Sequence, residues 1–178
     1  MTHRAVFLDR DGILNEAIIQ NGKPYPPRFL EEFSIIPGIS ERLEKLKKNG
    51  FFLIGVTNQP DVSRRITTRD FVNTLNTLIL HKLPIDEIFV CFHDDRDGCD
   101  CRKPLPGLFY QARDRYGIRL ENSYMIGDRW RDIESGTGAG CKTIFVDYGY
   151  QEPSPIEAAD YSCKSPIEAL DWILAREF

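Results

Sequence analysis

Five short apolar runs, rich in β-branched and aromatic residues, alternate along this chain with segments of helical periodicity. The runs cover residues 5–8, 51–56, 85–90, 124–126 and 143–146. Such alternation predicts a parallel sheet flanked by helices, a Rossmann-like α/β fold. Since the chain has 178 residues and no internal repeat, we expect a single domain spanning residues 1–178.

The intervening segments carry helix signals. Residues 39–48 place Leu43 and Leu46 on one face and are followed by Asn49-Gly50, a typical helix end. Thr67 is expected to cap the next helix. Its predicted apolar stripe is Phe71, Leu75, Leu78 and Ile79. Further helices are expected from near Pro106, after Trp130 and over residues 166–175, and the proline-rich stretch 21–33 is expected to be a loop.

Charge and hydropathy narrow the range of partners. The net charge of −4 and the isoelectric point near 5.4 give no basic field for a nucleic acid. No apolar run approaches the roughly 20 residues that cross a bilayer, and the first residues lack a secretory signal pattern. We therefore expect a cytoplasmic, monomeric protein that acts on a small molecule, with neither a nucleic acid nor a membrane as partner.

Two carboxylates stand where the first predicted strand ends, in the sequence Asp9-Arg10-Asp11-Gly12. Ligands of open parallel sheets bind at the carboxyl ends of the strands. Two neighbouring acids there are typical of a Mg²⁺ site, because Mg²⁺ prefers carboxylate and phosphate oxygens. Taken alone, the pair fits an Asx-turn or a helix N-cap equally well.

Three more polar motifs follow later predicted strands. Thr57-Asn58-Gln59 ends the second strand, Arg102-Lys103-Pro104 follows the third, and Gly127-Asp128-Arg129 ends the fourth, with Asp132 four residues after Asp128. Individually, Thr57 would more often be a turn residue, and an Arg-Lys pair would usually be solvated surface. Together the motifs predict a phosphate site with cations and a second carboxylate for the metal.

From about residue 4 to residue 148 these four motifs resemble those of the haloacid dehalogenase (HAD) superfamily of phosphatases. The resemblance implies that Asp9 is the nucleophile, forming an aspartyl-phosphate, and that Asp11 is the general acid and base. It implies Mg²⁺ held by Asp9, Asp128 and the backbone carbonyl of Asp11. Thr57 and Lys103 would then hold the phosphate oxygens.

Cys91-x-His93-x₅-Cys99-x-Cys101 offers three thiolates and one imidazole, the donor set of a closed structural Zn²⁺ site. The alternative is four unrelated polar loop residues. Zinc here would staple the loop and orient Arg102 and Lys103, which follow it directly, rather than activate water.

With this loop the chain resembles one subgroup of the superfamily, the heptose-bisphosphate phosphatases of lipopolysaccharide-precursor synthesis and the related histidinol-phosphate phosphatases. The resemblance implies that Asn58 and Arg102 contact substrate. It breaks at Pro60-Asp61 and Arg64-Arg65, where heptose-bisphosphate phosphatases usually carry Ser-Gly and Arg-Gly. Arg64 or Arg65 could hold a second anionic group, or the two could be an exposed surface pair.

No cap domain fits between Gly12 and Ile39 or between Gln59 and Lys103, so we expect an open site. The leading hypothesis is hydrolysis of the 7-phosphate of D-glycero-D-manno-heptose 1,7-bisphosphate. Histidinol phosphate or another sugar phosphate is the alternative substrate. A hypothesis of a different class is a zinc-stabilised binding module that has lost turnover.

Overall fold

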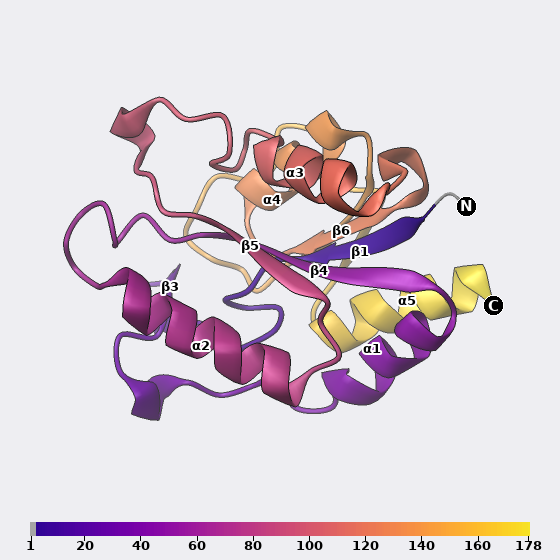
Figure 1. The fold of residues 1–178 in the computed structure, drawn as a ribbon, viewed down its shortest axis with the longest axis horizontal. Coiled ribbons are helices and arrows are strands. Elements are labelled where there is room, and N and C mark those ends of the chain that lie inside the picture. The colour runs from indigo at the N-terminus through magenta and orange to yellow at the C-terminus, as the bar shows by residue number, and fades with distance from the viewer. Residues whose placement is uncertain (1–2) are drawn as a thin grey trace.

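The computed structural model describes residues 3–178, and within them a six-stranded parallel sheet forms the centre of the molecule (Figure 1). Each strand pairs in parallel with its neighbours. In spatial order the strands are β5 (Glu87–Cys91), β4 (Phe51–Asn58), β1 (Arg4–Leu8), β6 (Tyr124–Gly127), β7 (Lys142–Val146) and β8 (Tyr161–Cys163). The chain moves outward from β1 first in one direction and then in the other, which creates a switch point beside β1.

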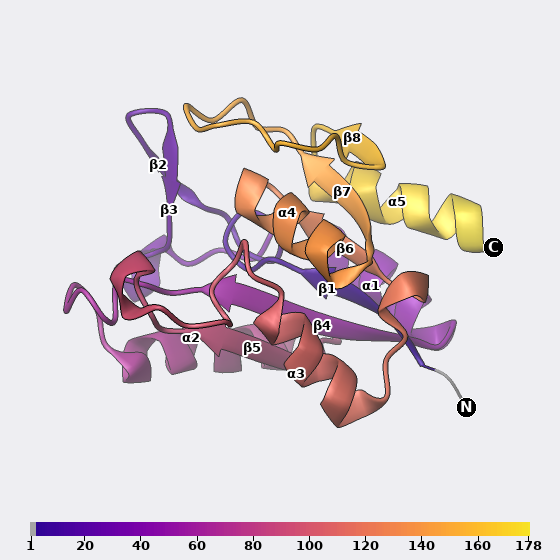
Figure 2. The ribbon, with the colours of Figure 1, turned by 90° about the horizontal axis from the view of Figure 1, so that it is seen from above.

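Helices cover both faces of the sheet, as the alternating pattern predicted (Figures 1 and 2). One face carries α1 (Ile39–Lys48), α2 (Arg69–Lys82) and α5 (Pro166–Glu177), and the other carries α3 (Gly107–Tyr116) and α4 (Trp130–Ala139). Three short 3₁₀ turns complete this part of the chain, at Leu30–Glu32, Asp95–Asp97 and Leu120–Asn122. None of the helices in the described part is both long and apolar enough to cross a membrane.

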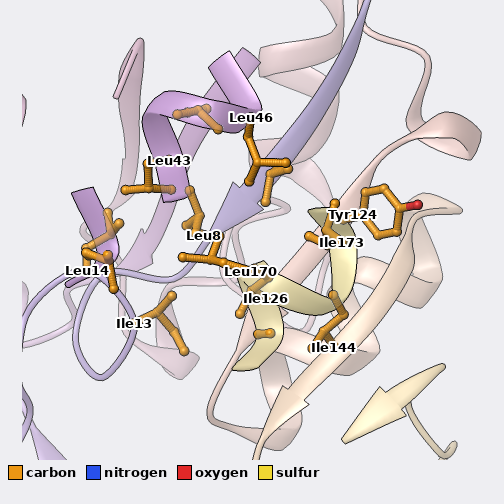
Figure 3. Close-up of a cluster of buried hydrophobic side chains, with 14 of the residues drawn as sticks. Leu8, Ile13, Leu14, Leu43, Leu46, Tyr124, Ile126, Ile144, Leu170 and Ile173 are labelled. Carbon is orange, nitrogen blue, oxygen red and sulfur yellow. The ribbon is translucent and has the colours of Figure 1, made fainter. Parts of the chain in front are cut away.

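Strand β1 is buried on both sides because its side chains alternate between two cores. Val6 and Leu8 join the cluster under α1 and α5, whereas Ala5 and Phe7 join the cluster under α3. In Figure 3, Leu8 lies among Leu43 of α1 and Leu170 of α5. Because the side chains on both faces of β1 are buried in apolar clusters, the register of the strand is fixed. The residue that follows it, Asp9, therefore has a fixed position.

The sequence predicted that the proline-rich stretch 21–33 is a loop, but part of it is a strand. It contains strand β3 (Lys23–Tyr25), which pairs antiparallel with β2 (Ile18–Gln20) in a separate two-stranded hairpin. Pro24 is tolerated because a two-stranded hairpin needs no second partner for its backbone. Figure 2 shows this hairpin projecting from the sheet on the side where the strands end.

Two other predictions needed correction. The side chain of Thr68, not Thr67, caps α2 by accepting a hydrogen bond from the Phe71 amide. The buried stripe of α2 is accordingly Val72, Leu75, Asn76 and Ile79, and the expected members Phe71 and Leu78 are only partly buried.

Strand β8 was not predicted, since three residues with Ser162 in the middle carry no strand signal. The expected bounds of α1 are confirmed.

Candidate active site

The central strand ends at a buried carboxylate, Asp9, which is bound by Lys103. The Asp9 amide donates to the carbonyl of Ile126 in β6 at 3.0 Å. Lys103 Nζ donates to Asp9 Oδ1 at 2.7 Å, to Asp132 Oδ1 at 2.6 Å and to the Val56 carbonyl at 2.8 Å. Lys103 is 2% exposed, so its three donors are all used inside the protein.

Three carboxylates meet at this point. Oxygens of Asp9, Asp128 and Asp132 lie within 4.8 Å of one another, and all three residues are buried. Lys103 neutralises one of these negative charges, which leaves the excess that a divalent cation would balance. Asp128 Oδ1 is buried with no hydrogen-bond partner among residues 3–178. An orphaned carboxylate oxygen beside two other hard donors fits Mg²⁺.

Burial and mutual repulsion shift the pKa values of these acids. Burial raises the pKa of Asp9 from its ordinary value to about 6, although Lys103 opposes the shift; Asp132 and Asp11 add to it. Burial, with the charges of Asp9 and Asp132, also raises the pKa of Asp128 well above the ordinary range. Ionised Asp9 and Asp128 therefore need a cation nearby.

Asp128 is fixed by the groups around its other oxygen. The Tyr150 hydroxyl donates to Asp128 Oδ2 at 2.9 Å. Gly12 has φ +99°, and a Cβ there would lie 2.0 Å from the same oxygen, so only glycine fits. Burial and the Asp128 charge raise the pKa of Tyr150, which keeps its hydroxyl a donor.

Asp11 points to a different network from the carboxylate cluster. Arg10, whose side chain is buried, donates from Nη2 to Asp11 Oδ2 at 2.9 Å and from Nη1 to Asn76 Oδ1 of α2 at 3.2 Å. Gln59 Nε2 donates to Asp11 Oδ2 at 2.8 Å, and Asn15 Nδ2 donates to Oδ1 at 3.0 Å. These donors fix the position of the Asp11 carboxylate, which also lines the pocket of the site.

Residues at the end of β4 hydrogen-bond to the backbone of Lys103. Asn58 Nδ2 donates to the Lys103 carbonyl at 2.9 Å, and the Lys103 amide donates to Asn58 Oδ1 at 3.1 Å. Thr57 Oγ1 accepts from Gln59 Nε2 at 2.9 Å. Asn58 thus clamps the Lys103 backbone, a role distinct from the substrate contact expected for it.

A pocket of about 280 Å³ opens above these strand ends. Asp9, Asp11, Thr57, Asn58 and Lys103 line its floor. Its walls include Lys23, Pro24, Tyr25 and Pro26 of the hairpin, together with Arg64, Arg102, Arg129 and Arg131. Of the two arginines that the sequence singled out, Arg64 reaches the pocket. Arg65 is exposed and lies outside this lining in the described structure.

Acidic side chains hold the arginines of the pocket wall. Arg102 Nε and Arg131 Nη1 both donate to Asp95 Oδ1, at 2.8 and 3.3 Å. Two guanidinium groups therefore share one carboxylate, which leaves net positive charge on that wall. Arg129 is paired with Glu152 instead.

The Cys/His cluster forms as predicted. Ligand atoms of Cys91, His93, Cys99 and Cys101 all lie within 4.8 Å of one another. Cys91 Sγ is 3.8 Å from Cys99 Sγ, and His93 Nδ1 is 3.4 Å from Cys101 Sγ. A tetrahedral zinc with Zn–S bonds of about 2.3 Å requires S···S edges of about 3.8 Å, so the four residues could hold Zn²⁺. A disulfide would need about 2.05 Å.

The loop that carries this cluster also reaches the pocket. Arg64 Nε donates to Asp94 Oδ2 at 3.0 Å, and this guanidinium lowers the pKa of Asp94 to about 2. Ser63 Oγ donates to Asp97 Oδ2 at 2.8 Å. Since Asp95 holds Arg102, order in the Cys/His loop is transmitted to two arginines of the pocket wall.

Sequence reasoning missed several contributors to the site. Arg10 could have been noticed as a cation between two acids, and Arg131 as the second arginine of the turn after Asp128. Asn76 and Tyr150 had no local signal, because each reaches the site from a distant element.

The fold and the strand-end carboxylates define a HAD-like hydrolase, and residues 100–170 match the HAD-hydrolase-like family profile. The chain is 36% identical over 178 residues to D-glycero-β-D-manno-heptose-1,7-bisphosphate 7-phosphatase of Helicobacter pylori J99, covering 97% of this chain and 98% of that protein. The Escherichia coli K12 enzyme of the same name is 33% identical over 183 residues, covering 96% and 87%. The chain belongs to the family of these bacterial phosphatases and is a phosphoric monoester hydrolase.

A solved structure agrees with the fold. The D,D-heptose 1,7-bisphosphate phosphatase from B. bronchiseptica, crystallised with magnesium and phosphate, superposes with a TM-score of 0.77. It is 24% identical, and the match covers 97% of this chain and 99% of that one. The match covers almost the whole of both chains, so the two share the HAD-like fold, and residues 3–178 of this chain form no cap domain.

Proposed function

We propose that the protein removes the 7-phosphate of D-glycero-D-manno-heptose 1,7-bisphosphate through an aspartyl-phosphate on Asp9. The observation that carries the mechanism is the contact between Lys103 Nζ and Asp9 Oδ1 at 2.7 Å, beside the orphaned oxygen of Asp128. This arrangement places a nucleophile (Asp9), a cation for the phosphoryl group (Lys103) and a metal ligand (Asp128) together at the carboxyl ends of the strands. The names of the relatives support the choice of substrate.

In the first step the Asp9 carboxylate attacks phosphorus in line while Asp11 gives a proton to the departing sugar oxygen. In the second step Asp11 takes a proton from water, the water oxygen bonds to phosphorus, and the acyl-phosphate bond breaks to regenerate Asp9. In both steps Thr57 donates to a phosphoryl oxygen, and the Lys103 ammonium turns one of its donors from Asp9 to the phosphoryl group and offsets its negative charge. Asp9, Asp128 and the Asp11 carbonyl would hold Mg²⁺, which supplies charge neutralisation.

The basic wall of the pocket supports a substrate with a second phosphate. Arg102 and Arg131 share Asp95, so an incoming anion can take a guanidinium contact without leaving Asp95 unpaired. Arg64, tied to Asp94, lines the same pocket. A monophosphate ester would leave this charge unused.

The proposal includes a single domain over residues 1–178, a monomeric state and a cytoplasmic location. One continuous sheet from β5 to β8 supports the single domain. None of the five cysteines forms a disulfide in the described structure, which suits a reducing compartment. Light scattering during gel filtration tests the monomer; a dimer mass would contradict it.

A substrate panel tests the proposed activity. Both anomers of heptose 1,7-bisphosphate, histidinol phosphate and an aryl phosphate are compared by Mg²⁺-dependent phosphate release. We expect the highest kcat/KM for a heptose bisphosphate. If it were turned over no faster than the aryl phosphate, the substrate assignment would fail. Asp9→Asn should abolish phosphate release while the protein stays folded, and retained turnover would refute Asp9 as the nucleophile. If the wild type itself hydrolysed none of the phosphate esters, the binding-module hypothesis would be favoured.

A further inference from the structure

The segment between β7 and β8 reaches back to the carboxylate cluster. Tyr148 donates from its hydroxyl to the Gly12 carbonyl at 2.9 Å, and the Gln151 amide donates to the Gly22 carbonyl at 2.8 Å. Figure 2 shows this segment beside the β2–β3 hairpin. Its two anchors flank Tyr150, whose ring packs on Tyr148 with centroids 5.5 Å apart. The backbone of the segment is therefore held independently of the Tyr150 hydroxyl.

The Tyr150 hydroxyl decides which oxygen of Asp128 is available. It donates to Oδ2 at 2.9 Å, the oxygen that occupies the space a Cβ on residue 12 would take. Oδ1 is left buried and unpartnered. A rotation of the carboxylate would break the Tyr150 hydrogen bond, so the hydroxyl keeps Oδ1 presented.

We propose that Tyr150 is a positioning residue for the metal: its hydroxyl locks the Asp128 carboxylate so that Oδ1 is presented to Mg²⁺. This inference rests on the proposed function, because it assumes that Asp128 is a metal ligand. Groups that orient metal ligands in this way typically change metal affinity roughly 10-fold to 100-fold when removed. Tyr150 has no assigned role in catalysis and does not line the substrate pocket in the described structure.

The test is calorimetric titration of MgCl₂ into zinc-loaded protein without substrate, comparing the wild type with Tyr150→Phe. We expect roughly 10-fold weaker Mg²⁺ binding in Tyr150→Phe, with kcat nearly restored at saturating Mg²⁺. Tyr110→Phe, which removes an exposed hydroxyl on α3 far from Asp128, is the matched control and should keep the wild-type affinity.

The outcomes separate the inference from the proposed function. Equal Mg²⁺ affinity in wild type and Tyr150→Phe would overturn the positioning role while leaving the metal site intact. An equal loss in Tyr110→Phe would also overturn it, because the loss would then not depend on the hydrogen bond to Asp128. Absence of Mg²⁺ binding by the wild type would overturn the metal site, and with it this inference. Thermal unfolding without Mg²⁺ reports whether each variant is folded.

Discussion

Lys103 Nζ and Asp132 Oδ1 lie 2.6 Å apart inside the protein, and the same ammonium contacts Asp9. Asp132 is the third helical residue of α4, and its Oδ2 accepts from the Arg129 amide at 3.0 Å. The start of α4 is thereby connected to the proposed nucleophile through one lysine.

Lys103→Met should abolish turnover and destabilise the fold. The substitution leaves Asp9 and Asp132 buried without their cation, and breaking a buried ion pair in this way costs about 3–5 kcal/mol. Phosphate release and urea unfolding measure the two effects. The exposed Lys82→Met on α2 is the control and should change neither. Unchanged stability in Lys103→Met would contradict the buried pairing.

Asn76→Ala should lower stability by about 1–3 kcal/mol, because Arg10 Nη1 is buried and would lose its acceptor. Without Asn76 the Arg10 side chain can move. Because Arg10 orients Asp11, this movement should reduce kcat more than it changes KM. Urea unfolding and steady-state kinetics provide the measurements. Asn73→Ala, at an exposed position of the same helix, should behave as wild type. A purely KM effect would argue against orientation of Asp11.

Arg131→Gln should raise KM for a heptose bisphosphate more than for an aryl phosphate. Its guanidinium lies on the pocket wall and shares Asp95 with Arg102, so its loss removes the net positive charge there. Arg113→Gln, on the exposed side of α3, is the matched control. Equal changes for both substrates would show that Arg131 has no part in binding a second phosphate.

Purified protein should contain about one zinc per chain, and Cys99→Ser should lose it. Loss of zinc should raise KM for the bisphosphate, because the loop that holds Arg64 and Arg102 is no longer stapled. Elemental analysis and kinetics measure both effects. Cys163→Ser, far from the cluster, should retain the metal. Zinc below half an equivalent in the wild type would contradict a structural site.

Acidification should stabilise the magnesium-free, zinc-loaded protein. Burial raises the pKa of Asp9 to about 6 in the fold, whereas an aspartate in the unfolded chain titrates near 4. The folded state therefore binds the Asp9 proton more tightly than the unfolded chain does. This difference stabilises the fold fully below about pH 4, and the contribution is lost as the pH rises through about 6. Thermal unfolding between pH 4 and 7 should show a falling Tm that is flatter in Asp9→Asn. Added Mg²⁺ should restore stability at pH 7, and parallel curves for the two proteins would contradict the shift.

Much of the fold could be predicted from the sequence, because the apolar runs and helix stripes are local patterns. The helix at Ile39–Lys48 was predicted to the residue, and each of the five predicted strand runs overlaps a strand of the six-stranded sheet. Strand β8 and the hairpin at Pro24 escaped prediction, since a short edge strand depends on its partner and not on its own composition.

The sequence alone determined the types of chemistry: strand-end acids at Asp9 and Asp128, a lysine after the third strand, and a Cys/His set within residues 91–101 with the donors of a zinc site. Each is set by residue type and spacing along a single segment. Tertiary structure decided which groups meet. Lys103 against Asp132, Arg10 against Asn76 and Tyr150 against Asp128 join residues 29, 66 and 22 positions apart. The packing of helices on the two faces of the sheet brings such pairs together, and no local pattern records it.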